Sequence, residues 1–434
     1  MKIVYIAYGL LTPTRAHNLQ TVATVDALTE RGFEVLFINP NLTPSGSGMH
    51  LPKCAGVLLQ AGKCFALHKR LTAKGRFWSL FLDRSAFALR CLRHVRAAAA
   101  DVLVTRDVVV CFWMLLARFF TRLPVVYELH TLEQVMFAPG EASAGELARS
   151  VQSATASDFA GYQHDESWPG KLFERFIRRV ENYTIRTARP VMVLTAAMAR
   201  RLEREFGITN SRVVPSGHAF SQLPVLQGED MRTRLGLPVN RRIAIYSGLS
   251  FHGKGLDLIF AVARHLPADC MIVVLGDTPE TSARLAALSR ELGLELNLLF
   301  IPSVPHQQVP AWLRSADAGL LLYPGSQYLA EFSSPLKVFE YLACGLPVIA
   351  TRLAALEEVV KDGVNGKLVD PQDPRAAAAE IATVLRDSQL LTRLGSAARQ
   401  CAAEYHYSRR AERIAEALGY CLAKTSEETP CIST

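Results

Sequence analysis

Hydrophobic residues occur in short continuous runs that alternate with longer segments of helical spacing. In the first half of the chain, residues 2–7 form an apolar run, Gly9 follows, and residues 15–31 have helical spacing closed by Gly32. Continuous apolar runs are typical of strands buried on both faces of a parallel sheet. Further strands of this kind are predicted at residues 34–38, 102–105, 124–128, 191–195 and 212–214. The pattern indicates a doubly wound α/β domain.

The second half repeats this plan. A strand at 243–247 is followed by a glycine-containing loop and a helix at 256–266. More strands are predicted at residues 271–275, 297–301, 319–322, 347–350 and 367–369. No hairpin signals separate them, so a second parallel sheet is expected. We therefore expect a first domain at 1–217, a linker at 218–237, a second domain at 238–405, and a C-terminal helix with a frayed tail at 406–434. Ligands would bind in a cleft between the carboxyl ends of both sheets.

Length and composition indicate a soluble globular protein of two or three domains. The chain has 434 residues, which is too long for one ordinary core. Half of the residues are apolar and a fifth are charged, as in soluble globular proteins. Its longest apolar run, residues 108–117, is too short to cross a bilayer. The nine cysteines are odd in number and scattered without a Cys-x-x-Cys pair. Reduced thiols in a cytoplasmic protein are therefore expected, and neither a disulfide framework nor a zinc site.

The net charge of +8 is unevenly placed. Residues 1–217 carry 27 Lys/Arg against 17 Asp/Glu (+10), whereas the remainder carries 21 against 23 (−2). Nine of the basic residues lie at 63–96, where Asp83 is the one acid. This asymmetry marks a domain boundary and a basic surface on the first domain.

The basic segment also has helical spacing. Its apolar residues Phe77, Phe81, Ala88, Leu92 and Val95 fall on one face. Asp83, Arg90 and Arg93 fall opposite, and Arg84 interrupts the apolar sector. Three interpretations remain open: a solvated surface helix, an interfacial helix on an anionic membrane, or a nucleic-acid surface. Phe77 and Trp78 beside Lys69, Arg70, Lys74 and Arg76 favour headgroups over bases.

Residues 333–351 are the most informative stretch. Ser334 is suited to an N-cap, Pro335 to the first helical position and Gly345 to the helix end. Lys337 then lies in the first turn, where the helix dipole disfavours a cation. This position is explained if an anion docks at the helix N-terminus. Glu340 lies on the same face, one turn deeper, where a carboxylate can accept hydrogen bonds from ribose hydroxyls.

Two other positions carry candidate chemistry. Lys254, between Gly253 and Gly255, precedes a helix and offers a point charge for a diphosphate. His130 follows an apolar strand at the carboxyl edge of the first sheet. The chain has neither a Walker motif nor a Gly-x-Gly-x-x-Gly fingerprint, which counts against a hydride-transfer enzyme.

The order of these pieces resembles a family 4 glycosyltransferase of the GT-B fold, with two Rossmann-like domains. The resemblance covers nearly the whole chain and is densest at 243–370. It rests on the turn at Gly9, His130, Val213-Val214-Pro215-Ser216-Gly217, Gly253-Lys254-Gly255, Leu275-Gly276-Asp277, Ser315-Ala316-Asp317 and the segment from Ser334 to Val348.

The resemblance implies a retaining, metal-independent hexosyltransferase that uses a nucleotide-diphosphate sugar, UDP- or GDP-linked, with no cofactor. Lys254 and Lys337 would neutralise the diphosphate. Amides around Ser334, Pro335 and Leu336, together with Gly9 and Gly248, would cradle it. Glu340 would bind ribose, Ser303 and Val304 would meet the base, and His130 would contact the sugar.

Two departures from the family pattern affect the sugar contacts. The family often has a glutamate eight positions before Glu340, where this chain has Phe332, so Glu331 is the candidate catalytic substitute. Leu249 stands after Gly248 where an arginine is frequent. A nucleotide-sugar isomerase or hydrolase and a non-catalytic nucleotide-sugar-binding protein therefore remain alternatives.

The acceptor is expected to be a hydroxyl of a lipid-linked or polysaccharide precursor in cell-envelope or exopolysaccharide biosynthesis. The basic segment would then hold the protein peripherally at the cytoplasmic membrane face, without nucleic acid as a partner.

Overall fold

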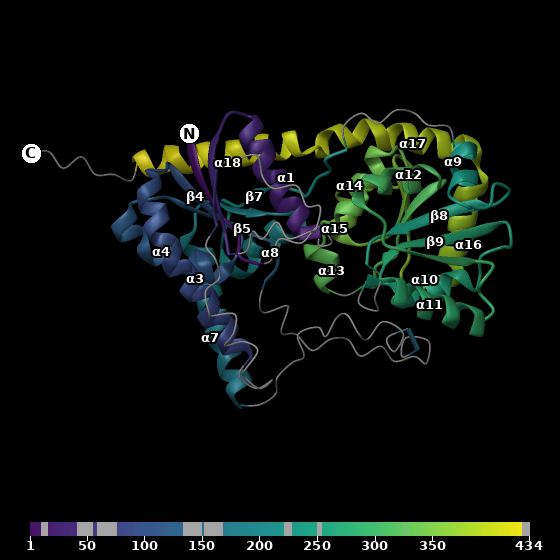
Figure 1. Cartoon of the computed structure of the whole chain (residues 1–434), viewed down its shortest axis with the longest axis horizontal. Helices are drawn as coiled ribbons and strands as arrows, with labels where there is room; N and C mark the ends of the chain where they lie inside the picture. Colours follow the sequence, from purple (N-terminus) through teal and green to yellow (C-terminus); the bar gives the residue numbers. More distant parts are fainter. Residues whose placement is uncertain are drawn as a thin grey trace, which may run out of the picture. The chain divides into compact units, whose positions relative to one another are not determined.

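The computed structural model describes residues 1–9, 16–40, 55–58, 76–132, 150–151, 168–220, 228–249, 254–325 and 327–427 (Figure 1). The chain divides into two compact units. Unit 1 comprises Met1–Pro139, Tyr162–Ser216 and Tyr407–Thr434, and unit 2 comprises Gly140–Gly161 and Gly217–His406. The C-terminal helix therefore belongs to unit 1.

Unit 1 is built on a seven-stranded parallel sheet in the order β3-β2-β1-β4-β5-β6-β7. Its strands are β1 (Lys2–Ile6), β2 (Glu34–Asn39), β3 (Ala55–Leu58), β4 (Val102–Thr105), β5 (Val125–Leu129), β6 (Val191–Val193) and β7 (Arg212–Val213). The helices among its described residues are α1 (Ala16–Glu30), α3 (Arg76–Ala98), α4 (Val108–Thr121), α7 (Trp168–Thr187), α8 (Ala196–Phe206) and α18 (Tyr407–Glu427).

Unit 2 is built on a six-stranded parallel sheet in the order β10-β9-β8-β11-β12-β13. Its strands are β8 (Arg242–Ser247), β9 (Cys270–Asp277), β10 (Leu298–Pro302), β11 (Ala318–Leu321), β12 (Val348–Thr351) and β13 (Gly366–Val369). Its helices include α9 (Gly228–Arg234), α10 (Leu256–Ala263), α11 (Pro279–Glu291), α12 (Val309–Arg314), α13 (Gln327–Phe332), α14 (Leu336–Ala343), α15 (Ala354–Glu357), α16 (Pro374–Arg386) and α17 (Ser388–Ala402). Two 3-10 turns, η3 (His306–Gln308) and η4 (Ala403–Tyr405), complete it.

The two parallel sheets predicted from the apolar runs are confirmed, and most strand ends agree within a residue or two. The exception is β3, a short strand that pairs in parallel with β2 and was not predicted. In both sheets the strand order reverses beside the first strand. The resulting switch points lie between β1 and β4 in unit 1 and between β8 and β11 in unit 2, where ligands bind in doubly wound folds.

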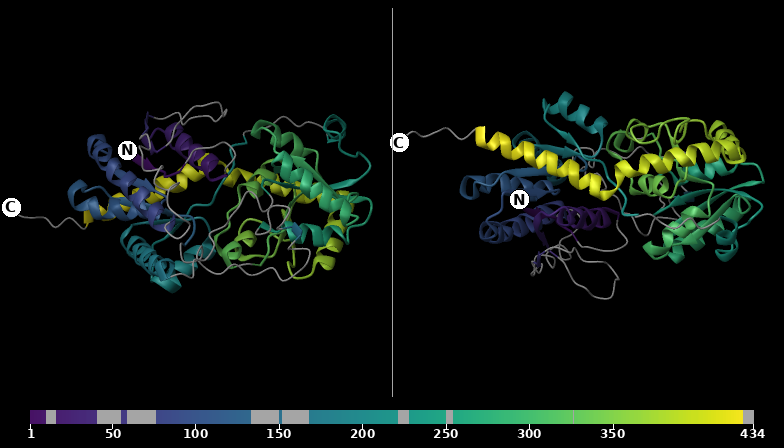
Figure 2. Two further views of the ribbon diagram at one scale, coloured as in Figure 1. Left: turned by 60° about the horizontal axis from the view of Figure 1, so that its bottom comes forward. Right: turned by 90° about the horizontal axis from the view of Figure 1, so that it is seen from above.

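Helix α18 returns to unit 1 and lies beside α1 (Figure 2). Its residues Tyr407, Ala411, Ile414 and Leu418 are buried in the same core as Val25 and Leu28 of α1. This packing brings residues from the end of the chain against the first sheet.

Helix α3 confirms the helical part of the basic segment, but its buried face is wider than predicted. Asp83 was expected to face solvent and is instead buried, with 6% of its surface exposed. Arg84 is half-buried and its Nε lies 3.3 Å from Oδ2 of Asp107. The reason is that α3 packs against both α4 and α7, so a single solvent-facing arc is left. Lys69, Arg70 and Lys74 lie outside the described residues.

Two aromatic residues of α3 contact α7. The Trp78 ring stacks on Phe176 at 5.4 Å, and Phe81 meets the same ring edge-on at 4.9 Å. The apolar run at 108–117 forms most of α4, which begins at Asp107 as N-cap. Among the described helices, none has the length and hydropathy to cross a bilayer.

Candidate active site

At the unit 2 switch point, two glycines leave the backbone uncovered by side chains. Gly248 directly follows β8 and Gly276 lies near the end of β9, and a Cβ on Gly276 would come 2.9 Å from Cα of Gly248. A Cβ on Gly248 would in turn lie 3.2 Å from Nζ of Lys337. Since neither glycine carries a side chain, the ammonium of Lys337 reaches the backbone at the end of β8.

Tyr341 anchors the helix that carries Lys337. Its hydroxyl accepts a hydrogen bond from the Ser247 amide at 2.8 Å and donates to the Leu320 carbonyl at 3.4 Å. Gly319 makes room for the ring, because a Cβ there would come 2.3 Å from it. Lys337 lies one turn earlier on α14, so this contact with β8 and β11 sets its position.

A close backbone contact places Lys254. Gly255 has φ +82° and is the N-cap of α10, and a Cβ there would come 1.6 Å from the Leu322 carbonyl oxygen. Only glycine fits this contact, which ties the start of α10 to the end of β11. Lys254 therefore lies at the switch point. Gly253 lies outside the described residues.

The two lysines share an environment that suits an anion. Burial lowers the pKa of Lys254. Burial, and then the charge of Lys254, hold the pKa of Lys337 well below its ordinary value, while Glu340 and Asp277 act in the opposite direction. Two neighbouring ammonium groups repel each other, and a negatively charged ligand stabilises the charged form of both. A diphosphate is such a ligand.

Glu340 lies on α14 beside the loop that follows β10. Its Oε1 is 3.2 Å from Nε2 of His306, and the hydrogen bond to Glu340 raises the pKa of His306. Ser303 and Val304 begin the same loop, and the Ser303 amide donates to the Asp277 carbonyl at 2.7 Å. The carboxylate and the predicted base-binding loop are thus neighbours, linked through His306.

The start of α14 differs from the prediction. The helix begins at Leu336, with Pro335 as N-cap at φ −73° and ψ 127°, so Ser334 lies outside the helix. The extended ψ of Pro335 delays the first helical turn by one residue. Lys337 remains in that turn. Glu331 is half-buried in the last turn of α13, beside the buried Phe332. Its proposed catalytic role stays a prediction.

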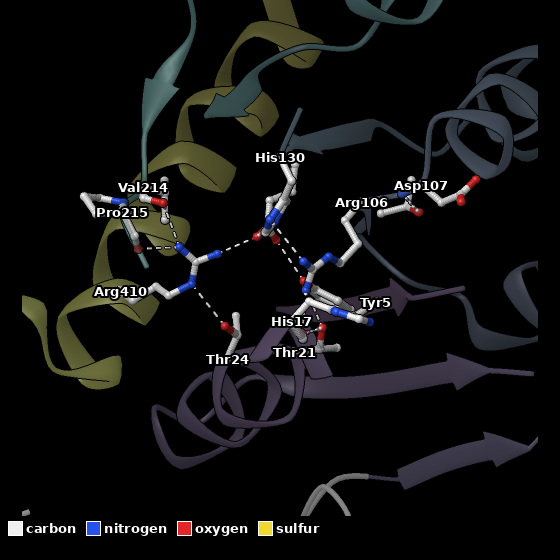
Figure 3. A network of polar contacts seen from close by, with 12 residues as sticks. Tyr5, His17, Thr21, Thr24, Arg106, Asp107, His130, Val214, Pro215 and Arg410 are labelled. Atoms are coloured by element: carbon white, nitrogen blue, oxygen red, sulfur yellow. Dashed lines mark hydrogen bonds and ion pairs between the residues drawn. The ribbon is translucent and has the colours of Figure 1, made fainter. Parts of the chain in front are cut away.

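In unit 1, His130 belongs to a polar network at the end of β5 (Figure 3). Its Nε2 lies 2.7 Å from Oε1 of Glu128 and its Nδ1 lies 3.0 Å from Nη2 of Arg106. Glu128 also accepts hydrogen bonds from the Tyr5 hydroxyl at 2.8 Å and from Arg410 of α18. Glu128 and Arg410 are each 1% exposed. This ion pair is completely buried.

The network sets the charge of each member. Arg410 and His130 hold the pKa of Glu128 well below its usual range despite burial. Burial, followed by the charge of Arg106, lowers the pKa of His130 to about 4. The imidazole is therefore neutral and the carboxylate ionised near neutral pH.

Gly9, the remaining predicted residue, follows β1 with φ +130°. Its carbonyl accepts a hydrogen bond from Asn39 Nδ2 at 3.1 Å. The structure therefore brings Gly248, Lys254, Lys337 and Glu340 into one region of unit 2, and places Gly9 and His130 at strand ends of unit 1.

Sequence reasoning missed Tyr341, His306, Arg106, Glu128 and Arg410. Glu128 lies two residues before His130 on a strand, a spacing that puts both on one face. This was the one local signal available. Arg410 lies 282 residues from Glu128 along the chain and had none.

Two family models match the chain in succession. The model of glycosyltransferase family 4 matches residues 19–218, and that of group 1 glycosyl transferases matches residues 227–401. Between them they cover most of both units, while α18 lies beyond the second match. The chain belongs to glycosyltransferase family 4.

Sequence relatives and solved structures agree with this membership. A D-inositol 3-phosphate glycosyltransferase from Xylanimonas cellulosilytica is 32% identical over 230 residues, half of this chain and 54% of the relative. The chain thus spans about half the length of the curated relatives it matches.

Solved structures of other proteins resemble this chain over nearly its whole length. Sucrose-phosphate synthase from Thermosynechococcus elongatus has a TM-score of 0.71 at 20% identity, covering 97% of this chain and 99% of that one. HepE from Anabaena, solved with UDP and glucose, has a TM-score of 0.66 at 17% identity, covering 97% and 100%. These similarities confirm the GT-B fold.

Proposed function

We propose that this chain transfers a sugar from a UDP- or GDP-linked donor to a hydroxyl acceptor with retention of anomeric configuration. The observation that carries the proposal is the pair of half-buried lysines at the unit 2 switch point, whose pKa values are lowered by desolvation. Negative charge develops on the leaving diphosphate in such a reaction, and fixed cations at that place lower the barrier. Lys254 and Lys337 would supply this charge.

Other residues would orient the donor. Glu340 would accept hydrogen bonds from ribose, Ser303 and Val304 would contact the base, and the amides near Leu336 would meet a phosphate. His130 would contact the sugar. Glu331 would take the catalytic place of the glutamate that the family often has eight positions before Glu340. The complexes of HepE with UDP and glucose and with UDP-glucose support a nucleotide-sugar donor.

Donor binding is tested by a thermal-shift panel of UDP-glucose, UDP-N-acetylglucosamine and GDP-mannose. A ligand at about 100 times its dissociation constant stabilises the protein by roughly 2.7 kcal/mol. Transfer is tested by nucleotide release with and without acceptor. Release that needs no acceptor would favour a hydrolase, and stabilisation without any turnover would favour a binding protein.

Stereochemistry and metal dependence are tested on the same reaction. NMR of the anomeric proton in the product should show the donor's configuration. Activity should survive EDTA, because the lysines supply the positive charge that a metal otherwise provides. Loss of activity with EDTA and recovery with manganese would contradict this part of the proposal.

We further propose that the acceptor is lipid-linked and that unit 1 holds the protein peripherally at an anionic cytoplasmic membrane face. Arg90, Arg93 and Arg96 are exposed on α3. On the neighbouring α4, Phe119 and Phe120 are exposed by 72% and 77%. Arginines attract anionic headgroups by about 1 kcal/mol each, and exposed phenylalanines add apolar burial.

Vesicle co-sedimentation tests this location. Changing Arg90, Arg93 and Arg96 to glutamate should abolish binding to anionic vesicles. The same charge change at the exposed unit 2 residues Arg290, Arg375 and Arg393 is the matched control. Equal binding to neutral vesicles, or equal loss in both triple variants, would remove the membrane proposal and leave the transferase proposal standing.

A further inference from the structure

The hydrogen-bond partners of His130 leave it only one protonation state. A guanidinium donates hydrogen bonds and cannot accept them, so Nδ1, which faces Arg106, must carry a lone pair. An ionised carboxylate accepts and cannot donate, so Nε2, which faces Glu128, must carry the proton. The contacts therefore describe a neutral imidazole protonated on Nε2.

We propose that Arg410 is a positioning residue that keeps His130 in this neutral state by pairing with Glu128. The ion pair joins α18 to β5, and both partners are buried. Arg410 is held firmly there, because Nη1 also donates to the Val214 carbonyl at 2.7 Å and Nε to the Thr24 hydroxyl at 3.0 Å. Helix α18 thereby controls the protonation state of His130, which lies at the carboxyl edge of the first sheet.

Among the described residues, Glu128 without Arg410 would keep Tyr5 and His130 as its hydrogen-bond donors. Neither is charged, and an unpaired buried carboxylate is costly. A proton on His130 relieves that cost by making an imidazolium–carboxylate pair. Arg410 also raises the energy of the imidazolium directly through charge repulsion. Its removal therefore favours a charged His130 by both routes.

The remaining groups around His130 do not provide a substitute. Arg106 is a cation and opposes protonation, and it is fixed by the His17 carbonyl and the Thr21 hydroxyl of α1. Tyr5 of β1 is neutral, since burial and the Glu128 charge raise its pKa. Arg106 also stabilises the Glu128 charge through space, but it bonds His130, and the cation in direct contact with Glu128 is Arg410 of α18.

The consequence for catalysis rests on the proposed function. Glycosyl transfer passes through a transition state in which the sugar ring carries positive charge. A neutral imidazole contacting the sugar leaves that charge undisturbed, whereas an imidazolium would repel it. Arg410 would therefore lower the barrier without touching the substrate.

The state of His130 is read directly by NMR of histidine-labelled protein, with the resonance assigned from a His130→Gln variant. In the native chain we expect the Nε2-protonated neutral tautomer throughout about pH 5.5 to 8.5. In Arg410→Met the pKa of His130 should rise by about 1 to 3 pH units. Arg409→Met is the matched control, because Arg409 is the exposed neighbour that pairs with Glu412. It should leave the His130 signal unchanged.

A second pair of variants separates charge control from loss of structure. Arg410→Lys keeps the cation and should keep His130 neutral. Glu128→Gln combined with Arg410→Met removes both charges, and it should restore the neutral tautomer and part of the kcat lost in Arg410→Met. A His130 that stays neutral in Arg410→Met, or that titrates near its ordinary pKa in the native chain, would overturn the proposal. A protein without transferase activity but with these NMR changes would refute the proposed function and leave the positioning role intact.

Discussion

Lys337 lies over the face of Tyr246, with Nζ 3.6 Å from the ring centroid. A ring face attracts a desolvated cation by roughly 2 kcal/mol or more, but unlike a carboxylate it brings no negative charge. The ammonium is thus held in place at the end of β8 without being neutralised. A diphosphate that binds there would gain a preoriented cation.

We first predict that Lys254→Ala and Lys337→Met each lower kcat by about 100- to 1,000-fold, because each removes a cation from the place where the leaving diphosphate gains charge. The fold should persist, since burial already disfavours both ammonium groups. Steady-state kinetics and thermal denaturation measure the two effects. Lys361→Ala, at an exposed lysine of the same unit, is the control. Turnover within a fewfold of the native rate would remove the lysines from the mechanism.

The second prediction concerns the anchor of α14. Tyr341→Phe keeps the ring against Gly319 but removes the acceptor of the Ser247 amide. Leaving that buried amide unpaired should cost about 1–3 kcal/mol of unfolding free energy. It should also weaken nucleotide binding, because Lys337 is on the same helix. Tyr183→Phe on α7 of unit 1 serves as the comparison, and equal effects in both variants would count against the anchor.

The local parts of this site were predictable and its anchors were not. Lys337, Glu340 and the Gly253–Gly255 loop lie in short motifs whose chemistry can be read from neighbouring residues. Tyr341 holds α14 in place because its ring packs on Gly319 and its hydroxyl accepts a hydrogen bond from the Ser247 amide. No spacing along the chain reveals these contacts. Arg410 and Glu128 meet for the same reason, through the return of α18 to the first sheet.

The fold shows the same division. Long apolar runs such as Met271–Leu275 predicted their strands because both faces of a parallel strand are buried. The strand at Ala55–Leu58 was missed because its four residues include a glycine and form no distinctive run. Asp83 was misplaced because helical spacing indicates a periodic face, whereas two neighbouring helices, α4 and α7, bury a wider arc.

A third prediction tests the ribose contact. Glu340→Ala should weaken binding of the nucleoside diphosphate, and it should also reduce the preference for UDP over 2′-deoxy-UDP. A lost hydrogen bond to a charged group costs about 1.5–3 kcal/mol. Isothermal titration with both nucleotides measures the preference. Glu357→Ala is the control, at a glutamate of the same unit whose side chain is 44% exposed and pairs with Arg352. An unchanged preference in Glu340→Ala would exclude the ribose role.

The fourth prediction is a pH dependence of stability. The folded chain holds His130 neutral with its pKa near 4, whereas the unfolded chain binds that proton near pH 6.5. As the pH falls between these values, the unfolded state takes up a proton that the folded state refuses, so stability falls. The loss from this residue amounts to about 3 kcal/mol at most. His130→Gln should reduce the slope of unfolding free energy against pH in this window. An identical slope in the variant would contradict the depressed pKa.

The fifth prediction uses two glycines with opposite environments. At Gly255 a Cβ would collide with the Leu322 carbonyl oxygen and φ is +82°, so Gly255→Ala must move backbone at the switch point. We expect a loss of several kcal/mol in unfolding free energy, on the order of other overpacked and strained sites. Gly419 is exposed in the interior of α18, with open space where a Cβ would be placed. Gly419→Ala should therefore stabilise the protein by roughly 0.5–1 kcal/mol through helix propensity. Chemical denaturation measures both changes.

Because α10 begins at Gly255 directly after Lys254, Gly255→Ala should also reduce affinity for the nucleoside diphosphate, whereas Gly419→Ala should not. A stable Gly255→Ala variant that binds the nucleotide normally would show that the contact with β11 does not position Lys254.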